Sequence, residues 1–349
     1  MLIDPAEVLA LYPLPWSSPA VQLQKQTAGW SGGTVWRVPV EGSDFALRLW
    51  PDSYPAGRIH AIHAAQQHAH EKGCRFIPQI IPAKDGSQLI VHQGCHLELA
   101  EWMPGEPAPT INPTEDHFHR AGAAIAQWHR AFSEPGLPGE LGLLSSPEAF
   151  DAIRSQRAIP SPAIARRLSE WQRLAPLIVS SRPAGGSSEV DFLTERTKRF
   201  ISGGLPSLHQ LASWESRPAR MVLSLADIHR EHVLFSQGRV SGIIDLGGVT
   251  IDSPALDLAR YGSSFDVDGT SLRQVVCVMS HGYREVARLE ESLEGLIISI
   301  AEVSTAIGAL HWWEWLTRTN SITPERRDAA TLRWAELLGR LEKWHDGGM

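Results

Sequence analysis

The chain is poor in cysteine: its 349 residues include only Cys74, Cys95 and Cys277, which lie far apart. Three widely spaced cysteines form neither a CxxC pair nor a disulfide framework, so a reducing, cytoplasmic environment is expected. The N-terminus lacks a basic segment followed by an apolar core, and we therefore expect no signal peptide.

The sequence also lacks a basic excess, because 32 Lys and Arg oppose 39 Asp and Glu, giving a formal charge of -7. Surfaces that bind nucleic acid or anionic lipid need such an excess, so neither partner is expected. The apolar run at residues 296–298 is interrupted by Ser299 and Glu302, whereas a membrane span needs ~20 apolar residues. The length predicts roughly two compact units, and we expect a monomer or homodimer.

The first hundred residues read mainly as strands. Strands are expected at residues 21–28, 34–40 and 45–50, which are separated by turns, and residues 34–40 alternate and carry β-branched side chains. One of these turns, at residues 29–33, holds Gly29, Gly32 and Gly33. A helix is expected over residues 58–72, ended by Gly73, followed by strands near residues 88–91 and 96–102. Together these patterns predict an antiparallel sheet with one helix.

Helical patterns dominate after a proline-rich linker at residues 104–109. Thr114 is placed to cap a helix that carries apolar residues at three- and four-residue spacing. Further helices are expected at residues 191–202, 254–262, 269–287, 292–317 and 324–345, whereas residues 137–188 give no clear pattern. Overall the sequence predicts an α+β protein with a large helical part.

A short strand-rich island lies between these helices. A strand at residues 220–225 leads to Asp227, and a hairpin at residues 232–244 then leads directly to Asp245. Asp227 and His232 therefore bracket the loop before the hairpin, and Asp245 leaves the hairpin at the same end. The spacing predicts that two carboxylates and an imidazole meet at one place.

The run Ala226-Asp227-Ile228-His229-Arg230-Glu231-His232-Val233-Leu234-Phe235 resembles the catalytic loop of the aminoglycoside phosphotransferase and choline kinase-like family. The family pattern, HGD-x-H-x-x-N-x-L-F followed by a hairpin and I-D, is completed by Ile244-Asp245. The segment 252–259 is similar to a further family segment, and the resemblance spans most of residues 20–265. It implies a bilobal protein-kinase-like fold with an antiparallel-sheet N-lobe (residues 1–102) and a larger helical C-lobe (residues 103–349).

The resemblance also implies a function: transfer of the γ-phosphate of ATP to a hydroxyl of a small molecule. It assigns Asp227 as the catalytic base and places Asp245 and His232 at the metal, Mg²⁺ or Mn²⁺. Nucleotide-binding roles follow for residues of the N-lobe and the hinge, where adenine is held by backbone groups. These residues are the turn glycines Gly29, Gly32 and Gly33, the strand cation Arg48, and Glu101 and Met103 of the hinge.

The sequence departs from the family pattern at four points. His232 replaces an asparagine, Leu225-Ala226 replaces His-Gly, Arg48 replaces a lysine, and residues 58–72 lack the expected acidic partner in their interior. Imidazole suits transition metals better than Mg²⁺, so either the metal preference is altered or Asp245 holds the metal with little help. The departures keep two alternatives open: a nucleotide-binding pseudokinase that acts as a regulatory module, or a metal-dependent hydrolase.

Several residues carry ordinary structural interpretations. We expect His229 to bond the loop backbone, Asp257 to anchor the catalytic loop, and the histidines of residues 60–70 to lie on a solvated helix face. The phosphate acceptor is expected over the C-lobe. A cationic acceptor would meet acidic candidates there, namely Asp266, Asp268 and Glu314.

Overall fold

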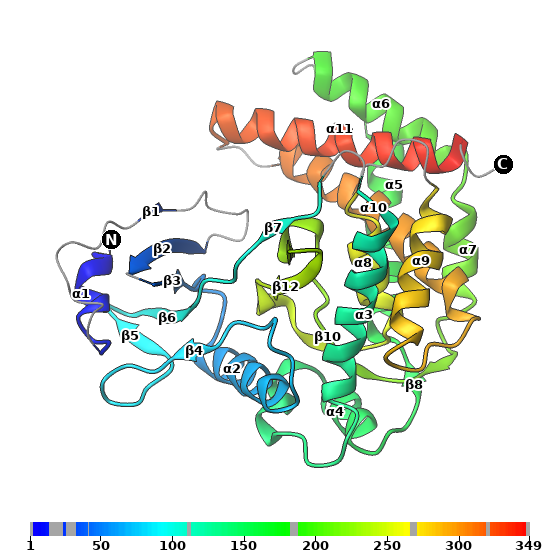
Figure 1. Cartoon of the computed structure of the whole chain (residues 1–349). Coiled ribbons are helices and arrows are strands. Elements are labelled where there is room, and N and C mark those ends of the chain that lie inside the picture. The colour runs from blue at the N-terminus through cyan, green and yellow to red at the C-terminus, as the bar shows by residue number, and fades with distance from the viewer. Residues whose placement is uncertain are drawn as a thin grey trace.

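The computed structural model describes residues 3–13, 24–25, 33–40, 42–109, 113–181, 188–265, 271–318 and 322–346. Figure 1 shows a small lobe, built from a sheet and two helices, beside a larger lobe built almost entirely from helices. This arrangement confirms the predicted α+β, protein-kinase-like architecture. The glycine turn lies outside the described residues except for Gly33.

The small lobe is an antiparallel sheet in the order β1-β2-β3-β6-β4, with β5 also paired to β6. Alternating side chains let β2, β3 and β6 bury one face, where Val38, Leu47, Leu97 and Leu99 pack against helix α1. The elements of this lobe are α1 (Pro5–Leu9), β1 (Gln24–Lys25), β2 (Thr34–Val40), β3 (Ser43–Leu49), α2 (Ala56–Glu71), β4 (Ile80–Ile81), β5 (Ile90–His92) and β6 (Cys95–Glu101).

Helix α2 does not present its histidines to solvent as a set. His63 and His70 are buried, at 2% and 8% exposure, and only His60 of the predicted row is exposed. The expectation of a solvated histidine face is therefore wrong for the inner residues. The reason is that buried polar groups are tolerated where they find partners: His63 meets Glu98 of β6, and His70 meets the carbonyl of Ile77.

The large lobe surrounds a continuous apolar core to which every long helix contributes. Its helices are α3 (Glu115–Ala131), α4 (Pro147–Arg154), α5 (Pro162–Ser180), α6 (Ser188–Ser202), α7 (Pro206–Ala212), α8 (Ala255–Gly262), α9 (Leu272–Arg284), α10 (Leu293–Arg318) and α11 (Pro324–Asp346). Thr114 caps α3 as predicted, in a capping box completed by His117.

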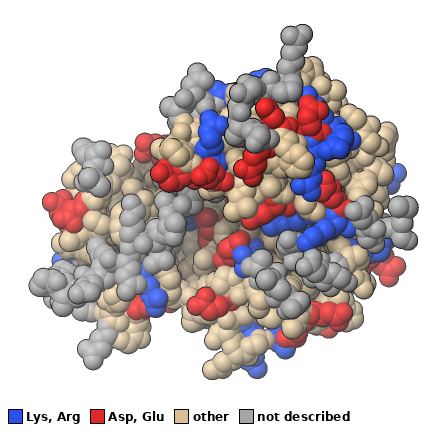
Figure 2. All heavy atoms as spheres, turned by 90° about the horizontal axis from the view of Figure 1, so that it is seen from above, with Lys and Arg blue, Asp and Glu red and all other residues tan. Residues whose placement is uncertain are grey.

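Helix α10 is long and apolar enough to cross a membrane by length and composition alone. In the structure, 67% of its apolar window is buried inside the protein, where α10 packs against α5, α7, α8 and α11. Packing within the large lobe therefore accounts for its apolar character. On the face over α6 and α11, acidic and basic side chains are interspersed, and neither sign forms a continuous area (Figure 2).

Short strands position the centre of the large lobe against the small lobe. The predicted hairpin forms as β11 (Val233–Ser236) and β12 (Arg239–Ile243), and β7 (Glu106–Pro107) pairs with β11. The proline-rich linker is therefore partly a strand, because its Glu106 lies opposite Phe235. Strand β10 (Val222–Ser224) pairs with β13 (Thr250–Asp252), and β8 (Ile159–Pro160) pairs with β9 (Pro218–Ala219).

Candidate active site

The loop after β10 is held by one buried carboxylate. Asp257, fully buried in α8, accepts hydrogen bonds from the Ser224 hydroxyl at 2.6 Å and from the amides of Leu225 and Ala226 at 2.7 Å each. Its second oxygen also lies 2.9 Å from Nε2 of His129 on α3. Four partners fix this carboxylate and with it the loop, which confirms the anchoring role predicted for Asp257.

Two tight backbone features bring the loop and the hairpin exit together. Ala226 and Asp245 both adopt left-handed conformations, with φ of 59° and 58°. Gly248 lies so close to the loop that a Cβ there would be 2.7 Å from Cβ of Asp227 and 3.0 Å from the carbonyl oxygen of Leu225. Only glycine permits this approach, so the segments that carry Asp227 and Asp245 are in direct contact.

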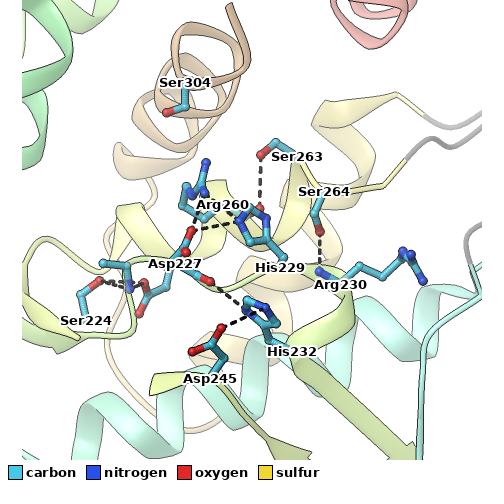
Figure 3. Close-up of polar contacts among 12 residues, drawn as sticks. Ser224, Asp227, His229, Arg230, His232, Asp245, Arg260, Ser263, Ser264 and Ser304 are labelled. Carbon is cyan, nitrogen blue, oxygen red and sulfur yellow. Dashed lines mark hydrogen bonds and ion pairs between the residues drawn. The ribbon is translucent and has the colours of Figure 1, made fainter. Parts of the chain in front are cut away.

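The carboxylate of Asp227 faces a guanidinium and an imidazole (Figure 3). Its Oδ1 lies 3.0 Å from Nε2 of His229 and accepts a hydrogen bond from Arg260 at 2.7 Å. These two partners, His229 first and then the Arg260 charge, hold the pKa of Asp227 well below its usual range. Asp227 is therefore an ionised hydrogen-bond acceptor at neutral pH.

His229 does not bond the loop backbone, contrary to our expectation. Its Nε2 lies between Asp227 and Arg260, 2.8 Å from the guanidinium. Burial, together with the Arg260 charge, lowers the pKa of His229 despite the nearby carboxylate, so the ring is neutral at neutral pH. The residue that the sequence analysis missed is Arg260, which follows Asp257 by three residues and reaches the loop because α8 packs beside it.

His232 joins the two aspartates. Its Nδ1 lies 2.9 Å from the backbone carbonyl of Asp227, and its Nε2 lies 3.9 Å from Oδ2 of Asp245. Because a carbonyl only accepts, Nδ1 carries the proton and Nε2 presents a lone pair toward the carboxylate. Two ligands with bonds of about 2.1 Å could share an ion across this gap, so the pair fits a divalent cation with a nitrogen and an oxygen donor.

The second carboxylate, Asp245, is engaged by the small lobe. Oδ1 of Asp245 accepts a hydrogen bond from Arg48 of β3 at 2.6 Å. Burial raises the pKa of Asp245, but the charge and the hydrogen bond of Arg48 oppose it, and the net pKa is lowered. The Arg48 guanidinium also lies over the Trp50 ring, 3.9 Å from its centroid, which fixes the direction in which it reaches the site.

The acidic residue expected in the interior of α2 is absent, and a buried hydrogen-bond network near Arg48 connects this helix to β6 instead. Oε2 of Glu98 on β6 accepts a hydrogen bond from Nε1 of Trp50 at 2.7 Å and lies 2.6 Å from Nε2 of His63 on α2. Arg58, also on α2, donates to the carbonyls of Gly247 and Val249 just after Asp245. The guanidinium of Arg58 thus connects α2 to the segment that follows Asp245. The only glutamate of α2, Glu71, is the last residue of the helix.

The structure describes only some of the residues predicted to bind the nucleotide. Gly29 and Gly32 lie outside the described residues, and Gly33 precedes β2 beside the carbonyl of Leu49. Glu101 ends β6, where its amide donates to the carbonyl of Gln79. Met103 is buried at the junction of the lobes, where it packs against Gly242 of β12.

Of the acidic candidates for a cationic acceptor, the described part of the chain includes only Glu314, which is held in ion pairs. Asp266 and Asp268 lie outside the described residues. Glu314 forms a bidentate ion pair with Arg173, at 2.8 and 3.1 Å, and a further contact with Arg318. The charged group nearest to Asp227 is instead the guanidinium of Arg260.

Comparisons with known proteins agree with this geometry. Residues 23–291 match the model of the phosphotransferase enzyme family. This match covers most of the chain, so the chain belongs to that family, and the predicted family is confirmed.

Individual relatives are distant. A homoserine kinase from Granulibacter bethesdensis is 20% identical over 290 residues, covering 82% of this chain and 79% of the relative. The structure of a microcompartment-associated aminopropanol kinase aligns with a TM-score of 0.64 at 17% identity, over 98% of this chain and 97% of that one. An amicoumacin kinase in complex with AMP-PNP and Ca²⁺ aligns with a TM-score of 0.61 at 11% identity, over 96% and 92%. At these identities the two structures show the shared fold.

Proposed function

We propose that this member of the phosphotransferase family is a small-molecule kinase that transfers the γ-phosphate of ATP to a hydroxyl group. The observation that carries the proposal is the convergence of Asp227 and Asp245. His232 contacts the backbone of the first and faces the carboxylate of the second, and Gly248 packs directly on Asp227. Phosphoryl transfer needs this combination of a base for the acceptor and an anionic site for a cation.

Asp227 is assigned to the acceptor. As an ionised carboxylate it accepts a hydrogen bond from the attacking hydroxyl, orients the oxygen and takes its proton as the new bond to phosphorus forms. Its low pKa makes it a weak base, so its main contribution is orientation. Arg260 and His229 hold the carboxylate in place from the side of α8 and the loop.

Asp245 and His232 are the residues that would hold a divalent cation, Mg²⁺ or Mn²⁺. When bound, such an ion supplies charge neutralisation at the β- and γ-phosphates. Arg48 is assigned to the phosphates themselves, because Arg can pair with phosphate through two parallel hydrogen bonds. Of the hinge residues, Met103 is the better assignment for holding adenine through its backbone, since the Glu101 amide already bonds to Gln79.

The acceptor is proposed to be a small hydroxylated molecule. The homoserine kinase relative and the aminopropanol kinase structure support this class, since both names denote compounds with a single hydroxyl group. An ATP-consumption screen against hydroxylated metabolites and antibiotics, run with Mg²⁺ and with Mn²⁺, tests the proposal. Turnover that requires one acceptor supports it, and ATP-independent phosphatase activity would favour a hydrolase instead.

The first prediction concerns the base. Asp227→Asn should lower kcat for the best acceptor at least a hundredfold, because the amide cannot take the proton. Nucleotide affinity, measured by calorimetry, should change less than threefold. Asp116→Asn, in an exposed ion pair on α3, is the matched control and should keep full activity. Full activity of Asp227→Asn would remove this residue from the mechanism.

The second prediction concerns the metal. His232→Asn replaces a nitrogen donor by an oxygen donor, so the ratio of Mg²⁺-supported to Mn²⁺-supported activity should rise. The measurement is kcat/KM for ATP with each metal. An unchanged ratio would show that His232 does not ligate the ion.

One observation favours a second function, a nucleotide-binding pseudokinase. Each carboxylate of the site is already paired with a guanidinium, Asp227 with Arg260 and Asp245 with Arg48. A kinase must release Arg48 from Asp245 when ATP and metal bind, whereas a pseudokinase would keep this pair. Nucleotide binding without turnover of any acceptor, with either metal, would favour the second function.

A further inference from the structure

A second cluster of metal-binding side chains lies outside the active site, where α3 and α9 cross. His119 of α3, His281 of α9 and Glu285, the C-cap residue that follows α9, place their ligand atoms within 4.8 Å of one another. Nε2 of His119 lies 3.1 Å from Oε1 of Glu285, and Nε2 of His281 lies 3.6 Å from the same oxygen. Two imidazoles therefore converge on one carboxylate.

The backbone beneath this cluster is rigidly packed. A Cβ at Gly282, the neighbour of His281, would lie 2.0 Å from the carbonyl oxygen of His119. A Cβ at Gly122, one turn along α3, would lie 2.1 Å from the carbonyl oxygen of Met279. The two helices thus touch backbone to backbone at both glycines, and the positions from which the three side chains project are fixed before any ion binds.

The donor set has a clear chemical preference. Two neutral imidazoles and a carboxylate suit zinc and similar transition ions, whereas Mg²⁺ and Ca²⁺ prefer oxygen donors only. In a tetrahedral zinc site with bonds of about 2.1 Å, the ligand atoms lie about 3.4 Å apart. The two measured separations, 3.1 and 3.6 Å, lie on either side of that value.

The surroundings do not oppose a cation. Arg284, the neighbouring cation on α9, is neutralised by Glu294 at 2.8 Å, and Arg120 on α3 is paired with Asp116 at 2.6 Å. The side chain of His281 is 73% exposed and that of Glu285 is 53% exposed, so an ion can enter directly from solution. Solvent can also supply the fourth ligand.

We propose that His119, His281 and Glu285 form a zinc-binding site that joins α3 to α9. The site is distinct from the carboxylates proposed for catalysis and does not depend on the kinase assignment. It lies on the two helices that support the catalytic loop, since His129 of α3 contacts both Tyr283 of α9 and Asp257. Bound zinc stabilises this crossing and hence the folded large lobe.

Zinc titration of the metal-free full-length protein tests the proposal. The titration is made in a His232→Asn background, which weakens the other nitrogen-containing candidate. One equivalent of Zn²⁺ should bind by calorimetry, and Tm should rise by about 3–6 °C at zinc a hundredfold above Kd. Cobalt(II) bound at the same site should give the visible absorption of a low-coordinate ion with nitrogen ligands.

Variants assign the ligands. His119→Ala, His281→Ala and Glu285→Gln should each weaken zinc binding at least tenfold and so reduce the Tm shift by about half or more. His311→Ala is the matched control, because His311 faces a single glutamate, Glu170, at 3.6 Å. It should bind zinc unchanged.

The exposed position of His281 keeps the test independent of folding, since its replacement removes no core contact. The proposal is overturned if zinc fails to bind in the His232→Asn background. It is also overturned if binding persists unchanged in both His119→Ala and His281→Ala.

Discussion

At the scale of single residues, the proposed active site depends on Ala226, which adopts a left-handed backbone conformation that favours glycine. Ala226 has φ of 59°, and its amide must point at Asp257 for the catalytic loop to be held. The left-handed conformation costs an L-residue about 1–2 kcal/mol, and the family pattern has glycine at this position. The chain therefore carries local strain beside its proposed base.

Replacing this alanine by glycine should stabilise the protein. Ala226→Gly relieves the strain but increases the entropy of the unfolded chain, so we expect a net gain of about 0.5–1 kcal/mol. Urea unfolding measures the change. The control is Ala255→Gly in the first turn of α8, which should destabilise because its backbone is helical. Equal losses in both variants would show that Ala226 is unstrained.

The residues of the site divide into those that local spacing predicts and those that only the fold brings in. Asp227, His232 and Asp245 are fixed by a loop and one hairpin, so their meeting could be predicted from the sequence. Arg260 and His229 could not be placed this way. An arginine inside a helix has no periodic signal that tells which distant carboxylate it will meet.

At the scale of secondary-structure elements, helix α2 meets the sheet through a buried polar pair, in addition to the apolar packing of its Ile59 and Ile62. His63 is 2% exposed and Glu98 is 5% exposed, and Trp50 donates to the same carboxylate. Removing one partner of a buried pair leaves the other without compensation, which typically costs about 3–5 kcal/mol. Replacing both by apolar residues of similar size costs much less.

A double-mutant cycle tests this attachment. His63→Leu should destabilise the protein by about 3 kcal/mol, and the double variant His63→Leu/Glu98→Leu should recover only part of that loss, because Nε1 of Trp50 then loses its acceptor. Chemical denaturation of the four proteins of the cycle gives the coupling energy. A double variant that is less stable than either single variant would contradict the pairing.

The elements themselves were predictable where the signals were strong. The strands β2, β3 and β6 and the helices α2, α3, α10 and α11 follow from alternation, apolar spacing and the cap at Thr114. Helices α4 and α5 were missed although each begins with a capping serine followed by proline, Ser146-Pro147 and Ser161-Pro162. The short strands β7 and β13 are too short for any period, and tertiary pairing alone defines them.

At the scale of the whole molecule, the C-terminal end of α2 holds the small lobe against α3 of the large lobe. Nε2 of His68 lies 3.0 Å from the carbonyl of Ala131, and Lys72 pairs with Glu134 at 2.5 Å. Between them Cys74 is 2% exposed and directs its thiol to the carbonyl of Gln127 at 3.6 Å. No periodicity in the sequence predicts such a junction, because the two segments are separated by the hinge.

Cys74 can therefore report whether the two lobes separate at this junction. Burial raises its pKa to about 11, so at pH 8 only about one thiol in a thousand is ionised, against roughly a quarter for an unperturbed thiol. In a Cys95→Ser/Cys277→Ser background, iodoacetamide should label native Cys74 at least a hundredfold more slowly than the unfolded chain. The reverse background, in which exposed Cys277 is the single thiol, should label rapidly. If the junction opens only on unfolding, the labelling rate of Cys74 will fall with added stabilising ligand and rise with urea in parallel with global unfolding. Rapid labelling under native conditions would instead mean that α2 and α3 part while each lobe stays folded.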